Sequence, residues 1–112
     1  MDSILITTKE LSGMTAGDDS FNKDVIMFIN NVFLTLKQLG VGPKEGFFIT
    51  GETETWSSFI PDNAVLREAV KSYMGNKVRL KFDPPTSSVL LEALSRDVAE
   101  SEWRLNVAAE ST

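Results

Sequence analysis

The clearest feature of the chain is an apolar stripe between residues 21 and 39, in which hydrophobic side chains recur every three or four positions. Its members are Phe21, Val25, Phe28, Ile29, Val32, Phe33, Leu36 and Leu39. This period predicts one long amphipathic helix that is central to the fold. Residues 18–20, Asp-Asp-Ser, offer capping oxygens to its start, and Gly40 suits a left-handed cap at its end. Ile26 and Met27 widen the apolar surface, so we expect a second partner surface on this helix.

Three further helices are predicted around the central one. Ser3–Leu11 reads as a short amphipathic helix, and a second amphipathic pattern begins near Pro61 and ends before Pro84, which disfavours helix at the preceding residue. The last helix follows Thr86-Ser87-Ser88 and has Leu91, Leu94, Val98 and Leu105 on one face. Gly75-Asn76 weakens the middle of the third helix, where we expect a kink.

Between the second and third helices the pattern changes from helical to extended. Phe47–Thr50 and Thr53–Trp56 are rich in β-branched and aromatic residues, with Gly51-Glu52 between them. The predicted fold is therefore mainly α: a small, four-helix bundle-like single domain over residues 1–112, with a short β-hairpin or extended loop between helices two and three. Its radius of gyration should be about 13 Å. Residues 108–112 are small and polar, and we expect them to be disordered.

Composition and charge narrow the classes of function. The 112 residues include 11 Lys plus Arg against 16 Asp plus Glu, a net charge of −5, with neither cysteine nor histidine. Disulfides, thiolate zinc sites and Ser-His or Cys-His nucleophile pairs are thereby excluded. The chain opens without the basic and apolar pattern of a secretory signal, and no apolar run is long enough for a membrane span. We expect an intracellular binding protein and no enzyme.

No segment predicts a cofactor or metal site. Asp18, Asp19 and Asp24 stand at a helix start, where capping explains them better than ligation of Mg²⁺ or Ca²⁺. Glu52 and Glu54 fit a solvated hairpin edge better than a catalytic carboxylate pair. The glycines match no nucleotide-binding motif.

Charge and the two tryptophans suggest contacts with other protein surfaces. Residues 62–82 contain five basic and two acidic side chains, and residues 83–112 contain two basic and six acidic ones. The two segments have net charges of opposite sign. These charges can attract each other within one subunit, or between two copies of the chain in a heterologous contact. For Trp56 and Trp103, core packing is the first interpretation and an interface the second.

Two other classes of function draw on particular residue types in the sequence. A small helical nucleic-acid-binding regulator would use the basic residues of the third helix, although their positions spread around it. These are Arg67, Lys71, Lys77, Arg79 and Lys81. A carboxylate-dependent hydrolase would need a metal, for which the usual ligand types are missing.

Several segments, in order along most of the chain, form a pattern that extends beyond any single helix: Asn30–Phe33, Leu36–Pro43, Phe47, Ile49, Trp56–Phe59, Val70–Tyr73, Lys77–Pro85 and Glu102–Asn106. Together these segments resemble the small head–tail connector (adaptor, or head-completion) proteins of long-tailed bacteriophages and their prophages. The resemblance implies a mainly helical structural subunit, about a dozen copies of which form a ring beneath the portal and link the DNA-filled head to the tail.

The same resemblance implies where the partners bind. The partners would be other copies of the chain, the portal protein and the next tail-side connector or stopper, while DNA passes through without specific binding. The location would be the virion, after assembly in the host cytoplasm. Portal docking is expected at Trp103, Arg104 and Leu105. A subunit interface or channel loop is expected at Lys44, Phe47, Phe48, Glu52, Glu54 and Trp56, and charged contacts between subunits at Arg67, Lys71, Lys77, Arg79 and Lys81.

Overall fold

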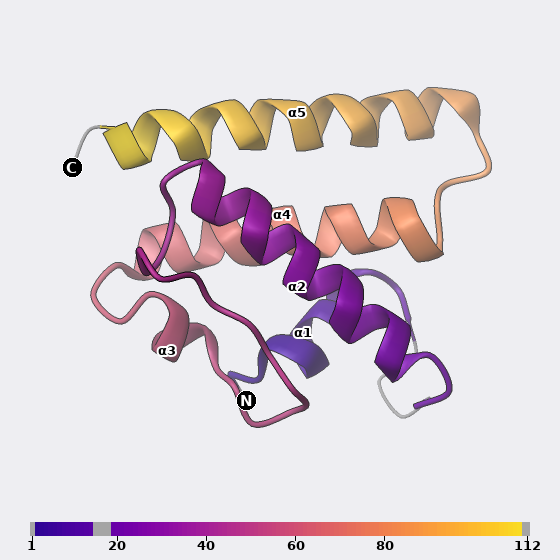
Figure 1. Cartoon of the computed structure of the whole chain (residues 1–112). Helices are drawn as coiled ribbons and strands as arrows, with labels where there is room; N and C mark the ends of the chain where they lie inside the picture. The colour runs from indigo at the N-terminus through magenta and orange to yellow at the C-terminus, as the bar shows by residue number, and fades with distance from the viewer. Residues whose placement is uncertain (1, 15–18, 111–112) are drawn as a thin grey trace.

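The computed structural model describes residues 2–14 and 19–110, which form five α-helices and, within those ranges, no β-strand (Figure 1). The predicted four helices are present, and a short fifth one lies between the second and third. The helices are α1 (Ile4–Leu11), α2 (Asn22–Gln38), α3 (Trp56–Phe59), α4 (Ala64–Phe82) and α5 (Ser88–Glu110).

Helix α4 is the hub of the fold. It contacts each of the other four helices: α1 and α3 lie beside it, α2 crosses it, and α5 runs back along it as an outer layer (Figure 1). The radius of gyration is 13.6 Å, as expected, and the extents are 38 × 33 × 21 Å. Among the described residues, no helix has the length and apolarity that crossing a membrane would require.

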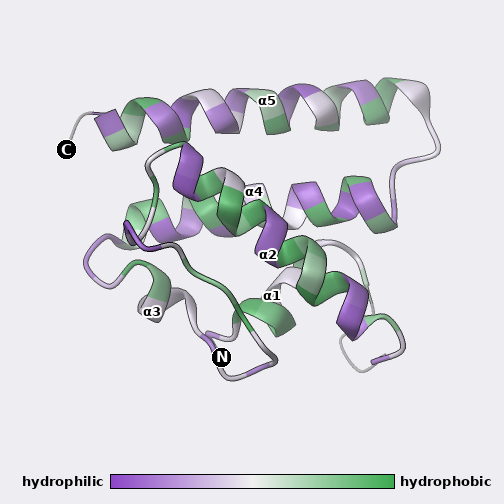
Figure 2. Cartoon of the chain, in the orientation of Figure 1, coloured by the Kyte–Doolittle hydropathy of each residue, from purple (hydrophilic) through white to green (hydrophobic). Residues whose placement is uncertain are grey.

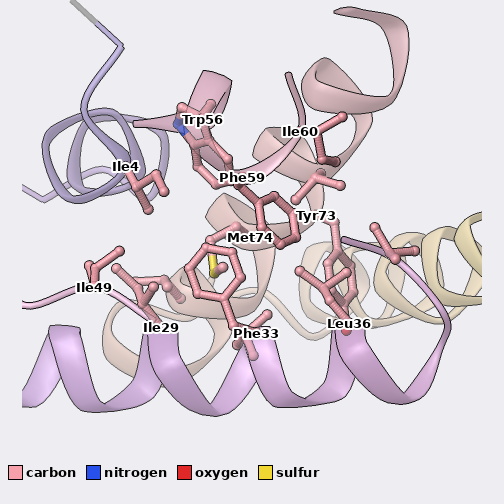
Figure 3. Close-up of a cluster of buried hydrophobic side chains, with 14 of the residues drawn as sticks. Ile4, Ile29, Phe33, Leu36, Ile49, Trp56, Phe59, Ile60, Tyr73 and Met74 are labelled. Carbon is pink, nitrogen blue, oxygen red and sulfur yellow. The ribbon is translucent and has the colours of Figure 1, made fainter. Parts of the chain in front are cut away.

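The apolar stripe of α2 supplies one wall of the core, as its period predicted. Val25, Ile29, Val32, Phe33 and Leu36 are buried, and Phe28 and Leu39 are partly buried. The prediction is wrong for Phe21, which precedes the helix and is 54% exposed. Figure 3 shows Phe33 and Leu36 directed from α2 toward the aromatic side chains of the facing segments. Phe33 lies at the centre of this aromatic cluster, because its ring is 4.8 Å from that of Phe59 and 5.2 Å from that of Phe47.

The structure confirms the predicted cap at the C-terminal end of α2 and contradicts the predicted cap at its N-terminal end. Gly40 has φ +88° and donates its N–H to the carbonyl of Lys37, while Val41 donates to Leu36, so the predicted left-handed cap is confirmed. The predicted N-cap is wrong for Asp19 and Ser20, since the helix begins after Phe21. The Asp19 carboxylate instead lies 3.6 Å from the buried ammonium of Lys9. Asp18 lies outside the described residues.

The predicted β-hairpin is wrong, because the backbones of its two segments pair with other parts of the chain rather than with each other. The side chain of Asn30 accepts from the N–H of Ile49 at 2.7 Å and donates to its carbonyl at 3.0 Å. Thr55 forms an isolated antiparallel bridge with Ser3. The segment is therefore an extended loop, the other form that the sequence allowed, and it is held by α2 on one side and by the start of the chain on the other.

Glu54 closes this loop on itself. Its carboxylate accepts hydrogen bonds from the N–H and hydroxyl of Thr50 and from the N–H of Gly51. Desolvation raises the pKa of Glu54, but these hydrogen bonds outweigh it and hold the pKa below its ordinary value. The carboxylate thus acts as an internal clamp rather than as a free hairpin edge.

We predict that Asn30→Ala destabilises the protein by about 2–3 kcal/mol, because the variant leaves the N–H and carbonyl of buried Ile49 unpaired. Urea unfolding would measure the loss. The control is Asn31→Ala on the exposed side of α2, which should change stability by no more than about 0.5 kcal/mol. Equal effects of the two substitutions would contradict this account of the loop.

Gly75 does not interrupt α4, which is helical from Ala64 to Phe82. A Cβ at this position would lie 2.8 Å from the Cβ of Leu11, so the glycine serves the close approach of α1 to α4. The helix continues through the glycine because the contact with α1 compensates for its low helix propensity.

The boundaries of the last two helices follow their caps. Asn63 is the N-cap of α4 and its side chain accepts from the N–H of Leu66, two residues after the predicted start near Pro61. Helix α4 ends before Asp83-Pro84, as predicted. Residues 108–110, expected to be disordered, continue α5 to Glu110, and residues 111–112 lie outside the described part.

Candidate interaction surfaces

The three residues predicted to dock on the portal point in different directions. Trp103 is 67% exposed, whereas Leu105 is buried against the core. Arg104 is exposed and forms an ion pair with Glu100, one turn earlier on α5. Only Trp103 and Arg104 are therefore accessible to a partner in this conformation, and the core-packing interpretation of Trp103 is wrong.

Trp103 belongs to an exposed apolar row on α5. Leu94, Val98 and Leu105 form the buried side of the helix. Val89 and Val107, like Trp103, are exposed large apolar residues, and the helical period places all three on the outer side. Figure 2 shows hydrophobic and hydrophilic residues mixed along the whole of α5 rather than separated into an inner and an outer face. Trp103 and Val107, one turn apart, are the part of this row that offers a partner a contiguous apolar contact.

The loop candidates divide between core and surface. Phe47 is partly buried, and its ring lies 5.2 Å from each of Phe33 and Phe59. Phe48 is 67% exposed, and Lys44 and Glu52 are exposed as well. The part of the loop that can meet a neighbour is therefore Lys44, Phe48 and Glu52.

Trp56 is fully buried, which confirms the core-packing interpretation of this tryptophan. It is the first residue of α3, whose N-cap Thr55 accepts from the N–H of Ser58. The indole nitrogen donates to the hydroxyl of Thr7 at 2.7 Å, and that hydroxyl donates to the carbonyl of Ser3. Trp56 thus joins α3 to α1 inside the subunit, and Figure 3 shows it above Phe59 in the core cluster.

Three of the five basic candidates on α4 have partners within the subunit. Arg67 donates to the carbonyls of Ile60 and Pro61. Lys71 pairs with Glu68 at 2.9 Å and lies 3.9 Å from Asp2. Lys77 lies 3.7 Å from Glu102 of α5.

Part of the opposite charge on α4 and α5 is therefore paired within the subunit, through Lys77 and Glu102. Glu102 also accepts from the hydroxyl of Tyr73 at 2.6 Å. Burial first, and then this carboxylate, raise the pKa of Tyr73 well above its ordinary value, so the phenol stays protonated as a donor. Arg79 and Lys81 are exposed, and in the described part of the chain no ion-pair partner is seen for either.

A groove of about 590 Å³ lies where the start of α4, the end of α5 and the turn after α2 meet. Most of its lining is small or apolar. The lining residues are Gly40, Val41, Gly42, Asn63, Val65, Leu66, Ala69, Ser72, Ser101, Arg104, Leu105, Ala108 and Ala109. A groove of this kind accepts apolar side chains of a partner more readily than a charged ligand.

Helix α2 carries a second row of exposed apolar residues, Met27 and Leu34, of which the sequence predicted only the first. Met27 was expected to contribute a partner surface, and it is 63% exposed. Leu34, seven positions later and thus on the same side of the helix, is 55% exposed, but its position outside the main stripe gave no reason to single it out.

Within residues 2–14 and 19–110, no cluster of three or more His, Cys, Asp or Glu side chains is placed to hold a metal ion. The surface features that a partner could contact are instead exposed apolar rows, a groove lined by small residues, and scattered charges. Fold and surfaces together describe a small all-α module with exposed apolar surfaces.

Comparison with known proteins places this module in a family. The family model described as "Phage connector protein" matches residues 4–112, so the chain belongs to the phage connector protein family. No curated protein and no solved structure matches the chain.

Proposed function

We propose that this protein is a structural subunit of the virion that joins the phage head to the tail. About a dozen copies would form a ring, the ring would dock on the portal, and DNA would pass through its channel. Membership of the connector family over residues 4–112 is the observation that carries the proposal. The exposed apolar surfaces support it, because a ring subunit must bury surface against neighbours on more than one side.

Helix α5 is the portal-docking element in this proposal. Its outer row supplies Trp103 as an anchor, and exposed tryptophans are enriched among residues that dominate binding energy. Arg104 stands next to it on the groove side of the helix. Leu105 contributes indirectly, since its burial fixes α5 against the rest of the subunit.

The acidic balance suits a conduit for DNA. Tight binding to duplex DNA requires lysines and arginines that replace condensed counterions, whereas this chain carries a net charge of −5. A ring of such subunits would repel phosphates along the channel rather than retain them.

The test is to mix the purified full chain with the portal protein of the same phage and to follow association by gel filtration with light scattering and by electron microscopy. We expect the wild type to form a ring on the portal and Trp103→Glu to bind the portal at least about 30-fold more weakly. The matched control is Phe21→Glu, which replaces an exposed aromatic residue at the start of α2.

Two outcomes would count against the proposal. A wild-type chain that remains monomeric and never associates with the portal would overturn the connector function itself. Equal losses of portal binding in Trp103→Glu and Phe21→Glu would overturn the assignment of α5 as the docking element.

A further inference from the structure

One face of the subunit presents large apolar side chains. Met27 and Leu34 stand on the outer side of α2, and Phe48 projects from the loop that follows. Leu34 and Phe48 both line a groove of about 360 Å³ between α2 and this loop. We name Met27, Leu34 and Phe48 the α2 face.

Another face presents small side chains between two grooves. Ala69 and Ser72 are exposed on α4 and form a ridge that ends at the larger Val65, which is 82% exposed. On one side of the ridge is the groove of about 590 Å³ against α5, and on the other a groove of about 340 Å³ against α1. Ser72 lines both grooves, and Leu11 adds an exposed apolar side chain to the second. We name this ridge with its two grooves the α4 face.

The two faces point in opposite directions. Helix α4 turns its buried side, which includes Val70 and Met74, toward the core that it shares with α2, and Ser72 lies on the other side of the helix. Helix α2 likewise buries Ile29 and Leu36 and turns Leu34 outward. A contact between the α2 face of one copy and the α4 face of the next is therefore head-to-tail, and each copy keeps one face free for a further neighbour.

The charges around the two faces are complementary. Lys37 and Glu45 line the groove of the α2 face, and the exposed Lys23, Asp24 and Lys44 stand close to its residues along the chain. The grooves that meet at Ser72 on the α4 face are lined by four carboxylates and two cations: Glu10, Glu68, Asp97, Glu100, Lys71 and Arg104. The α2 face thus has three cations against two carboxylates, a net charge of +1, and the α4 face has two cations against four carboxylates, a net charge of −2. Lys71 and Arg104 pair with Glu68 and Glu100, so the excess negative charge lies on Glu10 and Asp97.

We propose that a second copy of this chain is the occupant of the α4 face, and that its α2 face inserts Leu34 and Phe48 into the grooves beside Ser72. The large side chains of one face fit the small-residue ridge of the other, and the net charges attract. This inference rests on the proposed ring and specifies which surfaces join its subunits. Since α5 presents Trp103 to a third side, the portal anchor lies outside both faces, and Arg104 is the docking candidate that also borders the α4 face.

The absence of cysteine from the sequence makes a direct test possible. The double variant Leu34→Cys with Ser72→Cys carries one thiol on each face. Treated with a short bismaleimide, alone and on the portal, it should give a ladder of dimers, trimers and larger species on a denaturing gel. Either single variant should remain a monomer. The control pair, Leu34→Cys with Val89→Cys, moves the second thiol to the outer row of α5 and should give no ladder.

Charge substitutions give a second, independent readout. Leu34→Glu blocks one face and Ser72→Arg blocks the other, and both replace exposed side chains, so circular dichroism should be unchanged. Each variant alone should be monomeric. A mixture of the two should form a one-to-one dimer and nothing larger, because each variant retains only the face that the other has lost.

The outcomes separate this inference from the proposed function. Rings that form with both Leu34→Glu and Ser72→Arg would overturn the assigned faces and leave the connector function intact. Dimers from either single cysteine variant would show a two-fold contact and would also overturn the inference. A wild type that forms no ring, alone or on the portal, would overturn both proposals.

Discussion

Phe33→Ala should lower the free energy of unfolding by about 3–5 kcal/mol, which is a large share of the stability of a domain of this size. Phe33 is buried, and its ring contacts those of Phe47, Trp56 and Phe59. Removing the ring would open a cavity that separates α2 from the loop and from α3. Urea or thermal unfolding of the purified chain measures the loss.

Phe28→Ala is the matched control, because it removes the same side chain from the same helix. Phe28 is only half-buried, and its ring makes an edge contact with Phe82 at 5.9 Å. We expect a loss of about 1–2 kcal/mol, the value for partial burial of a phenylalanine. A larger loss at Phe28 than at Phe33 would mean that the core is not where the structure places it.

Gly42→Ala should be the most damaging single-methyl substitution in the turn after α2, at about 3 kcal/mol. Gly42 has φ +92°, which disfavours any side chain, and an added Cβ would lie 2.4 Å from the ring of Phe59. Since Phe59 packs on Phe33, the collision would be transmitted into the aromatic cluster.

Gly46→Ala is the control that measures how much of the lost stability comes from the left-handed backbone conformation alone. Gly46 has the same φ of +92°, but its added Cβ would meet only the flexible side chain of Lys37 at 3.5 Å. This variant should lose about 1–2 kcal/mol, the cost of the left-handed conformation alone. The same denaturation series measures both glycine variants, and equal losses would show that contact with Phe59 contributes nothing.

The helices could be predicted from the sequence because their signals are local. The apolar period of α2, the glycine at residue 40 and the proline at residue 84 each act within one or two turns, and all three gave the observed boundaries. The extended loop was different. Its β-branched residues allowed a hairpin, but the side chain of Asn30, which lies 19 positions before Ile49, supplies the hydrogen bonds that a partner strand would have supplied. No local pattern reveals such a partner.

The surfaces were predictable to a smaller extent. The sequence identified Trp103 and Phe48 as candidates but gave no means of separating them from Trp56 and Phe47, which are buried or partly buried. Residue type indicates that an aromatic side chain seeks an apolar contact, whereas the tertiary fold decides whether that contact is internal. The α4 face could not be predicted at all. Its grooves are formed by α4 together with α1 and α5, so they cannot be located until the positions of those helices are known.

The contact between the first residues and the middle of the chain also determines when the subunit can be completed. Ser3 pairs with Thr55, the indole of Trp56 binds Thr7 across 49 positions, and α1 packs mainly on α4. Each of these contacts closes a loop of about 50 residues, which costs entropy and slows folding. During synthesis, α1 has no surface on which to pack until α4, which follows it in the chain, has emerged. The burial of α1 therefore depends on all of the chain that lies between it and α4.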